Sequence, residues 1–338
     1  MKTEILAVID TAVAQGVRHC RACILVKIDE RRVHRWRSRA ERLDDRAPGP
    51  LHAPHALLDS ERDAIKQIAL DEKYVDDSHR ILTAKAADMG LFHVSASSVY
   101  KVMRKNNLTA DRCHRSHRNG KSTAPDRPDL TGPNQRWCWD ISYCRTIVKG
   151  IFLYLFVLLD EYSRKVVAWR ISWNITYKEA MELLQEGLEI EGLIDVEVKL
   201  PDLINDRGTQ MKAKAFMKMC VTLGINQKFA RPRTPNDNPF IESLFSTVKG
   251  YQTYPGWFTD DIEAITWFTV FFNFYNNERY HGELNYVTPV QKHNGLDVKI
   301  IERRVKGNML ARKARLEQNR KTTLIQNVAS FATCSLFS

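Results

Sequence analysis

The chain has 338 residues, enough for two or three domains, and its 43% apolar content suits ordinary globular cores. Its net charge of +11 is concentrated in two segments, residues 101–127 and 296–338, each of which carries +6. Such segments indicate a polyanionic partner such as nucleic acid, although solvated linkers explain the charge equally well. The sequence shows no membrane-length apolar run, no signal-peptide pattern and seven scattered cysteines, so we expect no membrane partner and a reducing, cytoplasmic location.

Residues 1–46 are predicted to form three short helices. Gly16 ends the first, residues 17–28 form the second, and Asp29 is a good N-cap for the third, residues 31–42. The third helix, RRVHRWRSRAER, is strongly basic. Helix, turn and basic helix together predict a helix-turn-helix unit, although a solvent-exposed basic helix explains the pattern equally well.

A second three-helix unit is predicted at residues 55–108, after a proline-rich linker. Asp59 and either Ser95 or Ser97 are expected N-caps, while Asp77-Ser78 precedes the second helix and Gly90 ends it. Its third helix is the candidate recognition helix, with Val99, Val102 and Met103 toward the core and Lys101, Arg104 and Lys105 toward DNA. A purely structural helical bundle is the alternative. Residues 109–133 form a basic linker that can lie along a phosphate backbone.

Several cysteines and histidines invite comparison with a zinc site. Cys20 and Cys23 form a close pair, but the other possible ligands lie some 90 residues downstream in a different predicted unit. Structural zinc sites usually combine two close pairs, so we do not expect zinc here. The distant ligands are Cys113, His114 and His117.

From Asn134 onward the pattern changes to a mixed α/β layer fold. Strands are predicted at residues 137–143, 151–159 and 165–171, and their short connections indicate a meander. The later elements are a helix at 177–189, a strand at 196–204, a helix at 212–223, a strand at 225–230 and a helix at 239–250.

Three carboxylates stand out in this region: Asp140 inside the first strand, Asp206 after a later strand and Glu242 in the last helix. Thirty-five residues separate Asp206 from Glu242. An unpaired charge at Asp140 would be costly among apolar neighbours, and divalent cations would offset that cost. Three converging carboxylates would hold two hard cations, which predicts phosphodiester chemistry on nucleic acid.

Residues 134–294 resemble the catalytic core of the retroviral-integrase and DDE-transposase superfamily, and within it the bacterial insertion-sequence transposases. The resemblance rests on W-x-W-D-I-S-Y around Asp140, LLDEYSRKVVAW at 158–169, NDRGTQ at 205–210, RPRTPNDNPFIES at 231–243 and YNNERYHGELNYVTP at 275–289. It implies a ribonuclease-H-like fold with a mixed five-stranded sheet, in which Asp140 lies on the first strand, Asp206 follows the fourth and Glu242 lies on a nearby helix.

The resemblance also implies an activity. Two Mg²⁺ or Mn²⁺ ions held by Asp140, Asp206 and Glu242 would support cleavage at a transposon end and strand transfer by the resulting 3′-OH. It further implies double-stranded DNA partners, both element ends and target, a homo-oligomeric synaptic complex, and a nucleoid-associated location in a bacterial cytoplasm. One alternative is a sequence-specific DNA-binding regulator with an inactive core, and another is a nuclease acting on RNA–DNA hybrids.

Residues around Glu242 are further candidates for DNA contact. Lys249 lies two helical turns after Glu242 on the same face, and Asn236 lies in the loop before this helix. Asp237 or Asn238 could cap the helix, which would explain this polar loop without DNA. We interpret His281 and the aromatic residues of 267–275 as structural, and residues 295–338 as a basic C-terminal tail.

Overall fold

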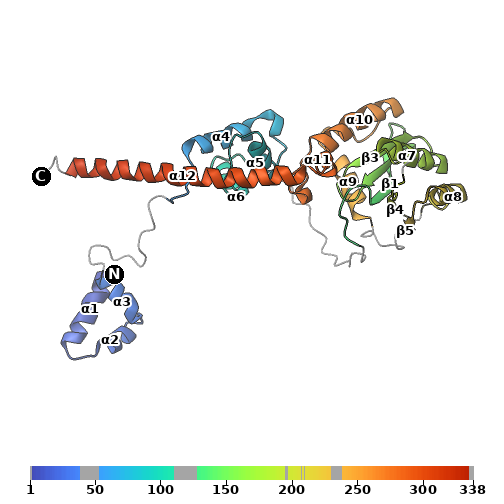
Figure 1. The fold of residues 1–338 in the computed structure, drawn as a ribbon. Helices are drawn as coiled ribbons and strands as arrows, with labels where there is room; N and C mark the ends of the chain where they lie inside the picture. The colour runs from blue at the N-terminus through green and yellow to red at the C-terminus, as the bar shows by residue number, and fades with distance from the viewer. Residues whose placement is uncertain are drawn as a thin grey trace. The chain divides into compact units, whose positions relative to one another are not determined.

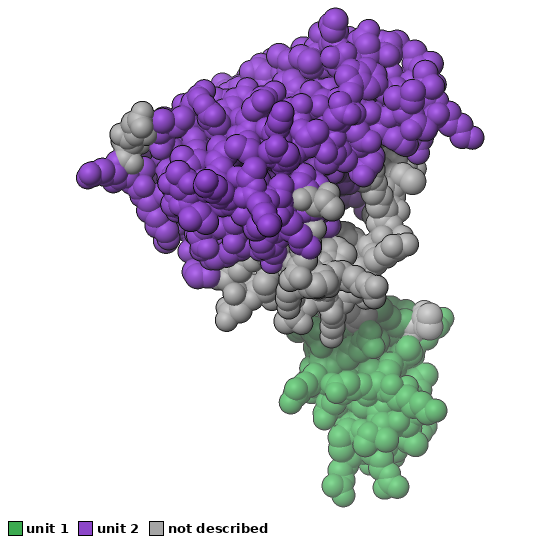
Figure 2. Space-filling view, turned by 90° about the vertical axis from the view of Figure 1, so that its right-hand side faces the viewer, with its two compact units in different colours: residues 1–56, 314–338 green, residues 57–313 purple. Residues whose placement is uncertain are grey.

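The computed structural model describes residues 2–38, 53–109, 128–194, 197–206, 208, 210–229 and 238–334, with side chains as far as residue 322. The chain divides into two compact units, residues 1–56 with 314–338 and residues 57–313 (Figure 2). Within the described ranges, no helix is both long enough and apolar enough to cross a membrane.

Three helices form the N-terminal part of the first unit: α1 (Lys2–Ala14), α2 (His19–Leu25) and α3 (Glu30–Arg37) (Figure 1). Asp29 caps α3 as predicted, because its carboxylate accepts a 2.8 Å hydrogen bond from the Arg31 N–H. Residues 39–42, the predicted end of this helix, lie outside the described residues. A small core of Ile9, Ala22, Cys23 and Val33 holds the three helices together.

The second unit begins with α4 (Asp59–Leu70), a short 3₁₀ helix η1 (Glu72–Tyr74), α5 (His79–Asp88) and α6 (Ala96–Lys105). Ser78 caps α5, and Ser95, one of the two predicted candidates, caps α6. Asp59 does not cap α4. It is the first helical residue, and the preceding Leu58 donates its N–H to the Glu61 carboxylate at 3.0 Å. On α6 the predicted core residues are buried and Lys101, Arg104 and Lys105 are exposed.

A five-stranded mixed sheet forms the centre of this unit, in the order β3-β2-β1-β4-β5. The predicted meander is confirmed, since β1, β2 and β3 pair antiparallel, while β4 pairs parallel with both β1 and β5. The strand predicted at 196–204 is shorter than expected because Pro201 lacks an N–H, and pairing begins only at the next residue. The strands are β1 (Arg136–Arg145), β2 (Phe152–Asp160), β3 (Val166–Ser172), β4 (Asp202–Asn205) and β5 (Gln227–Phe229).

Helices cover both faces of the sheet, which agrees with the expected ribonuclease-H-like core. Alternate residues of a strand point to opposite faces. Trp137 and Trp139 of β1 accordingly pack with α7 (Tyr177–Ile190) and α8 (Lys214–Leu223), whereas Cys138 and Cys144 pack with α9 (Pro239–Lys249) and α10 (Asp261–Asn277). Asp140 has the parity of Cys138, so β1 directs it to the face that α9 covers.

The chain ends in a long helix that the sequence interpretation missed. A short 3₁₀ helix η3 (Gly282–Leu284) and α11 (Pro289–His293) lead into α12 (Asp297–Cys334), which has 38 residues. Within the second unit, Arg304 of α12 binds the carboxylate of Asp88 through Nη2 at 2.6 Å and Nε at 2.8 Å. Tyr280 donates its hydroxyl to the same carboxylate at 2.7 Å, so Asp88 ties α5 to two segments far along the chain.

Candidate active site

Asp140 lies in the central strand β1, directly opposite Val157 of β2. Its Oδ1 accepts a hydrogen bond of 2.8 Å from the N–H of Ile141. Burial is the largest influence on this carboxyl and raises its pKa, as do the negative charges of Asp206 and Glu242, while the hydrogen bond from Ile141 lowers it; the resulting pKa is about 7. The charges that act on Asp140 from described residues are both negative, so its own ionisation is opposed.

Asp206 is placed beside Asp140 by strand register. The parallel pairing of β1 with β4 sets Cys138 opposite Ile204. Asp140 lies two residues further along β1, and Asp206 directly follows Asn205, the last residue of β4. Asn205, fully buried, donates its side-chain amide to the Asp206 carbonyl at 2.7 Å. The exposed Asp206 carboxylate accepts the Gly208 N–H at 2.9 Å, which orients it at the end of β4.

Glu242 lies in the first turn of α9, and its pKa is raised by burial. The start of this helix is tied to the strand that carries Asp140, because buried Asn238 donates its amide to the Trp139 carbonyl at 3.4 Å. Pro239 occupies the first turn as expected, but Asn238 makes no side-chain cap. The amide of Asn238 therefore positions the helix against the sheet instead of capping it.

The three carboxylates lie near one another without direct contact among all three. The charges of Asp206 and Glu242 act on Asp140. The oxygens of the three carboxylates do not all lie within 4.8 Å of one another. Among the described residues, the group of potential metal ligands that meets this distance is His19, Glu30 and His34. The donor set consists of carboxylate oxygens alone, as hard divalent cations prefer. Among the described residues, the charges that act on Asp140 are those of two carboxylates and include no cation. This charge pattern fits a site that binds divalent cations.

Comparison with known proteins bears on this arrangement. An integrase core domain model matches residues 131–235, and a second integrase core domain model matches residues 223–289. Residues 131–289 therefore match integrase core domains, which is just under half of the chain. Both matches fall within the stretch that holds the sheet, Asp140, Asp206 and Glu242.

Relatives of this integrase core include the transposase for insertion sequence element IS904 of Lactococcus lactis, which is 29% identical over 183 residues. That match covers 51% of this chain and 69% of the relative. The InsF transposase for insertion sequence IS3A of Escherichia coli is 31% identical over 122 residues, covering 35% of this chain but only 39% of the relative. The core is thus similar in sequence to insertion-sequence transposases.

Solved retroviral structures are similar to a lesser degree. The simian T-cell lymphotropic virus intasome in complex with the PP2A regulatory subunit B56 gamma has a TM-score of 0.42 at 17% identity, covering 68% of this chain and 74% of that chain. The magnesium complex of the HTLV-2 integrase catalytic core, in its trimeric form, has a TM-score of 0.37 at 15% identity, covering 48% of this chain and 98% of that chain.

The predicted DNA contacts of the integrase core occupy exposed positions where they are described. Lys249 is exposed at the end of α9. Burial raises the pKa of Cys144, and the charge of Lys249 lowers it to a smaller extent. Lys249 therefore lies on the side of α9 that faces β1. Asn236 lies outside the described residues. Lys101, Arg104 and Lys105 form an exposed basic strip on α6.

The aromatic residues of α10 are core residues, as predicted, because Phe268, Phe271, Phe272 and Tyr275 are buried. His281 lies in an extended backbone segment before η3, and its N–H donates to the Val287 carbonyl at 3.0 Å. Burial, followed by the nearby Arg164 charge, lowers the pKa of its imidazole. Its structural role stays a prediction.

Two features near the site were missed from the sequence. The guanidinium of Arg164 stacks 3.5 Å above the ring of Phe240, two residues before Glu242. Ser163, His293 and Asp160 form a buried hydrogen-bonded group that resembles a catalytic triad in composition. Ser163 donates its hydroxyl to Asp160 at 2.7 Å and is fully buried, so it is a structural residue and not a nucleophile.

Proposed function

We propose that this chain is a transposase that cleaves DNA at the ends of a mobile element and joins the cut ends to target DNA. The observation that carries the proposal is the approach of Asp206 and Glu242 to Asp140, whose carboxyl pKa their charges help raise to about 7. Such an accumulation of carboxylates requires compensation by cations, and the relatives named above are transposases.

Asp140, Asp206 and Glu242 are the residues that would hold two Mg²⁺ or Mn²⁺ ions. When bound at a phosphodiester, such ions supply Lewis acidity that lowers the pKa of the attacking oxygen and stabilises the leaving oxygen. The chain contributes the placement of the three carboxylates. Asn205 and Asn238 hold the backbone beside Asp206 and Trp139 through the hydrogen bonds described above, so the donors converge from three separate elements.

Basic residues outside the carboxylate group would bind the DNA substrate. Lys249 extends from the helix that carries Glu242 and can contact a phosphate beside the reacting one, while Asn236 precedes that helix. Lys101, Arg104 and Lys105 would contact the element end through α6 as a recognition helix. Double-stranded element ends and target DNA are the proposed partners, brought together by a homo-oligomer in a bacterial cytoplasm.

The decisive experiment measures strand cleavage and joining of labelled element ends by the full-length protein with Mg²⁺. Asp140→Asn, Asp206→Asn and Glu242→Gln should each lower both activities by at least about a hundredfold, because removal of one ligand charge weakens the whole donor set. Element-end binding, measured by gel shift, should be unchanged. Glu302→Gln provides a control. Glu302 is an exposed residue of α12 and does not belong to the group of three carboxylates.

The same assay separates the alternatives. Retained joining by any of the three acid variants would contradict the assignment of that residue. Sequence-specific end binding by the unmodified protein without Mg²⁺-dependent cleavage would instead identify a DNA-binding regulator with an inactive core.

A further inference from the structure

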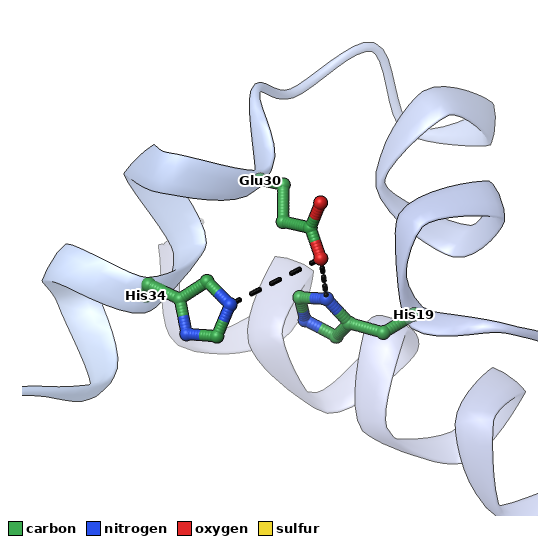
Figure 3. A group of neighbouring side chains, drawn as sticks. All are labelled: His19, Glu30 and His34. Carbon is green, nitrogen blue, oxygen red and sulfur yellow. Dashed lines mark hydrogen bonds and ion pairs between the residues drawn. The ribbon is translucent and has the colours of Figure 1, made fainter.

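A second group of potential metal ligands lies in the N-terminal helices, far along the chain from the carboxylates of the core (Figure 3). His19 projects from α2, and Glu30 and His34 lie one turn apart on α3 with their side chains directed toward His19. His19 Nδ1 is 2.9 Å from Glu30 Oε1, and His34 Nε2 is 4.0 Å from the same oxygen. One ligand atom from each residue lies within 4.8 Å of the other two.

A thiol lies beside this group, outside the set whose ligand atoms all lie within 4.8 Å of one another. Cys23 lies one helical turn after His19 on α2, and its Sγ is 3.9 Å from His19 Nδ1 and 3.8 Å from Nε2. The thiol is buried while the two imidazoles reach the surface, so the four side chains extend from the helical core to solvent. Two nitrogens, one oxygen and one sulfur form a donor set that suits tetrahedral Zn²⁺ and is softer than the all-oxygen set of Asp140, Asp206 and Glu242.

The size of the local core gives a physical reason for a metal here. The shared core of α1, α2 and α3 is small: its buried members are Ile9, Ala22, Cys23 and Val33, and partly buried apolar side chains pack against them. A small core gains stability from a disulfide, a metal or association. A metal bridging α2 and α3 would fix the angle between the two helices of the predicted helix-turn-helix.

We propose that His19, Glu30, His34 and Cys23 bind one Zn²⁺ ion that joins α2 to α3. This group differs from the cysteine pair weighed in the sequence, because it uses neither Cys20 nor the distant ligands. Cys113, His114 and His117 lie outside the described residues.

Arg37 opposes this proposal and provides a way to test it. Its Nη1 lies 3.2 Å from His19 Nε2, and its guanidinium also pairs with Asp10. In this arrangement His19 accepts from Arg37 and donates Nδ1–H to Glu30, which is a self-sufficient hydrogen-bond network. Zinc binding through Nδ1 would move the proton to Nε2, and Arg37 would release the ring while retaining Asp10. Arg37→Gln should therefore tighten zinc binding, since it removes both a competing donor and a like charge.

The test uses full-length protein carrying Asp140→Asn and Glu242→Gln, so that the proposed carboxylate site does not contribute metal. After stripping with a chelator and titration with Zn²⁺, elemental analysis should give one ion per chain. Glu30→Gln and His34→Ala should each weaken binding at least tenfold. His34 is well exposed, so its truncation leaves the packing intact, and His55→Ala tests the loss of an unrelated surface imidazole.

Two local readouts distinguish a built site from adventitious binding. Co²⁺ should give a thiolate charge-transfer band that Cys23→Ser abolishes and that Cys20→Ser, an exposed neighbour, preserves. Zinc at a hundred times its dissociation constant should slow hydrogen exchange of α2 and α3 amides by up to about a hundredfold. Equal zinc binding by His34→Ala and the parent, or exchange unaffected by zinc, would leave only the hydrogen-bond network and overturn the proposal.

Discussion

His293 Nε2 lies 2.8 Å from the Glu191 carboxylate, although the two residues are 102 positions apart in the chain. The contact joins α11 to the end of α7, and Lys165 binds the same carboxylate at 2.6 Å. Ser163 uses its hydroxyl hydrogen for Asp160, so its oxygen accepts from His293 Nδ1, and both imidazole nitrogens then carry protons. The network therefore contains a buried imidazolium between carboxylates.

This network predicts a pH-dependent stability. Burial opposes the charge on His293, but the nearby carboxylates of Asp160, 3.8 Å from Nδ1, and of Glu191 raise its pKa above 6.5 overall. Burial likewise opposes the Glu191 charge, while its bonds to His293, Lys165 and Asn134 lower its pKa to about 2. The His293 contribution is complete below its unfolded pKa of about 6.5 and is lost as pH rises through the raised value. The Glu191 contribution is complete above about 4.5 and is lost as pH falls toward 2.

His293→Gln should therefore destabilise the protein most between about pH 4.5 and 6.5, by roughly 2 kcal/mol. The difference from the parent should shrink at higher pH. Urea denaturation at a series of pH values measures it, and Glu191→Gln should lose stability in the same window. A difference that grows steadily above pH 7 would show that the neutral imidazole is the stabilising form.

The contact between Arg164 and Phe240 predicts that Arg164 helps to position Glu242. The guanidinium lies 3.5 Å above the ring and also pairs with Glu283 at 3.5 Å. Arg164→Lys keeps the charge but loses the planar stacking, so we expect DNA joining to fall about fivefold with under about 1 kcal/mol of lost stability.

Phe240→Leu should have a similar effect on joining, because it removes the other partner of the same contact. Joining rates at saturating DNA and thermal denaturation measure the two effects separately. Unchanged joining by both variants would show that α9 is positioned by its contacts with the sheet alone.

The hydrogen bonds to the Asp88 carboxylate predict that a conservative substitution at this residue causes a large loss of stability. Its carboxylate accepts hydrogen bonds from Tyr280 and Arg304, and Asp88 and Arg304 are largely buried. Asp88→Asn leaves the Arg304 charge without its partner and should cost about 3 kcal/mol. Tyr280→Phe removes one neutral donor and should cost about 1 kcal/mol. Chemical denaturation of both variants checks the order, and a larger loss for Tyr280→Phe would contradict it.

Local patterns predicted most of the fold, and long-range contacts account for what they missed. The strands of the meander and the serine cap of α6 depend on neighbouring residues, which is why they were predictable. The link between His293 and Glu191 forms only in the folded chain and leaves no local signal. Helix α12 was missed because its charges and apolar residues lack the one-sided stripe that marks a packed helix.

The candidate site shows the same division. Sequence spacing and motifs identified Asp140, Asp206 and Glu242, but only strand register places Asp206 beside Asp140. The Asn238 contact that holds α9 to β1 joins residues 99 positions apart, and a capping role was the local expectation. Tertiary packing therefore decides how closely the three carboxylates approach.

We predict that Gly187→Ala destabilises the protein, although alanine has a higher helix propensity than glycine. It lies in α7 against the sheet, and a Cβ at this position would meet Leu158 Cδ2 at 2.6 Å, with Trp137 and Val167 atoms at 3.5 Å. Alanine favours a helix by about 1 kcal/mol over glycine, but overpacking of a core costs about 1–3 kcal/mol. Because Trp137 and Val167 also lie at contact distance from the added methyl group, Gly187→Ala should be destabilising by about 1 kcal/mol. Adding Leu158→Ala should make the alanine at 187 neutral or stabilising, and a double-mutant cycle measured by urea denaturation gives this coupling. Additive losses would instead show that α7 shifts away from the sheet to admit the methyl group.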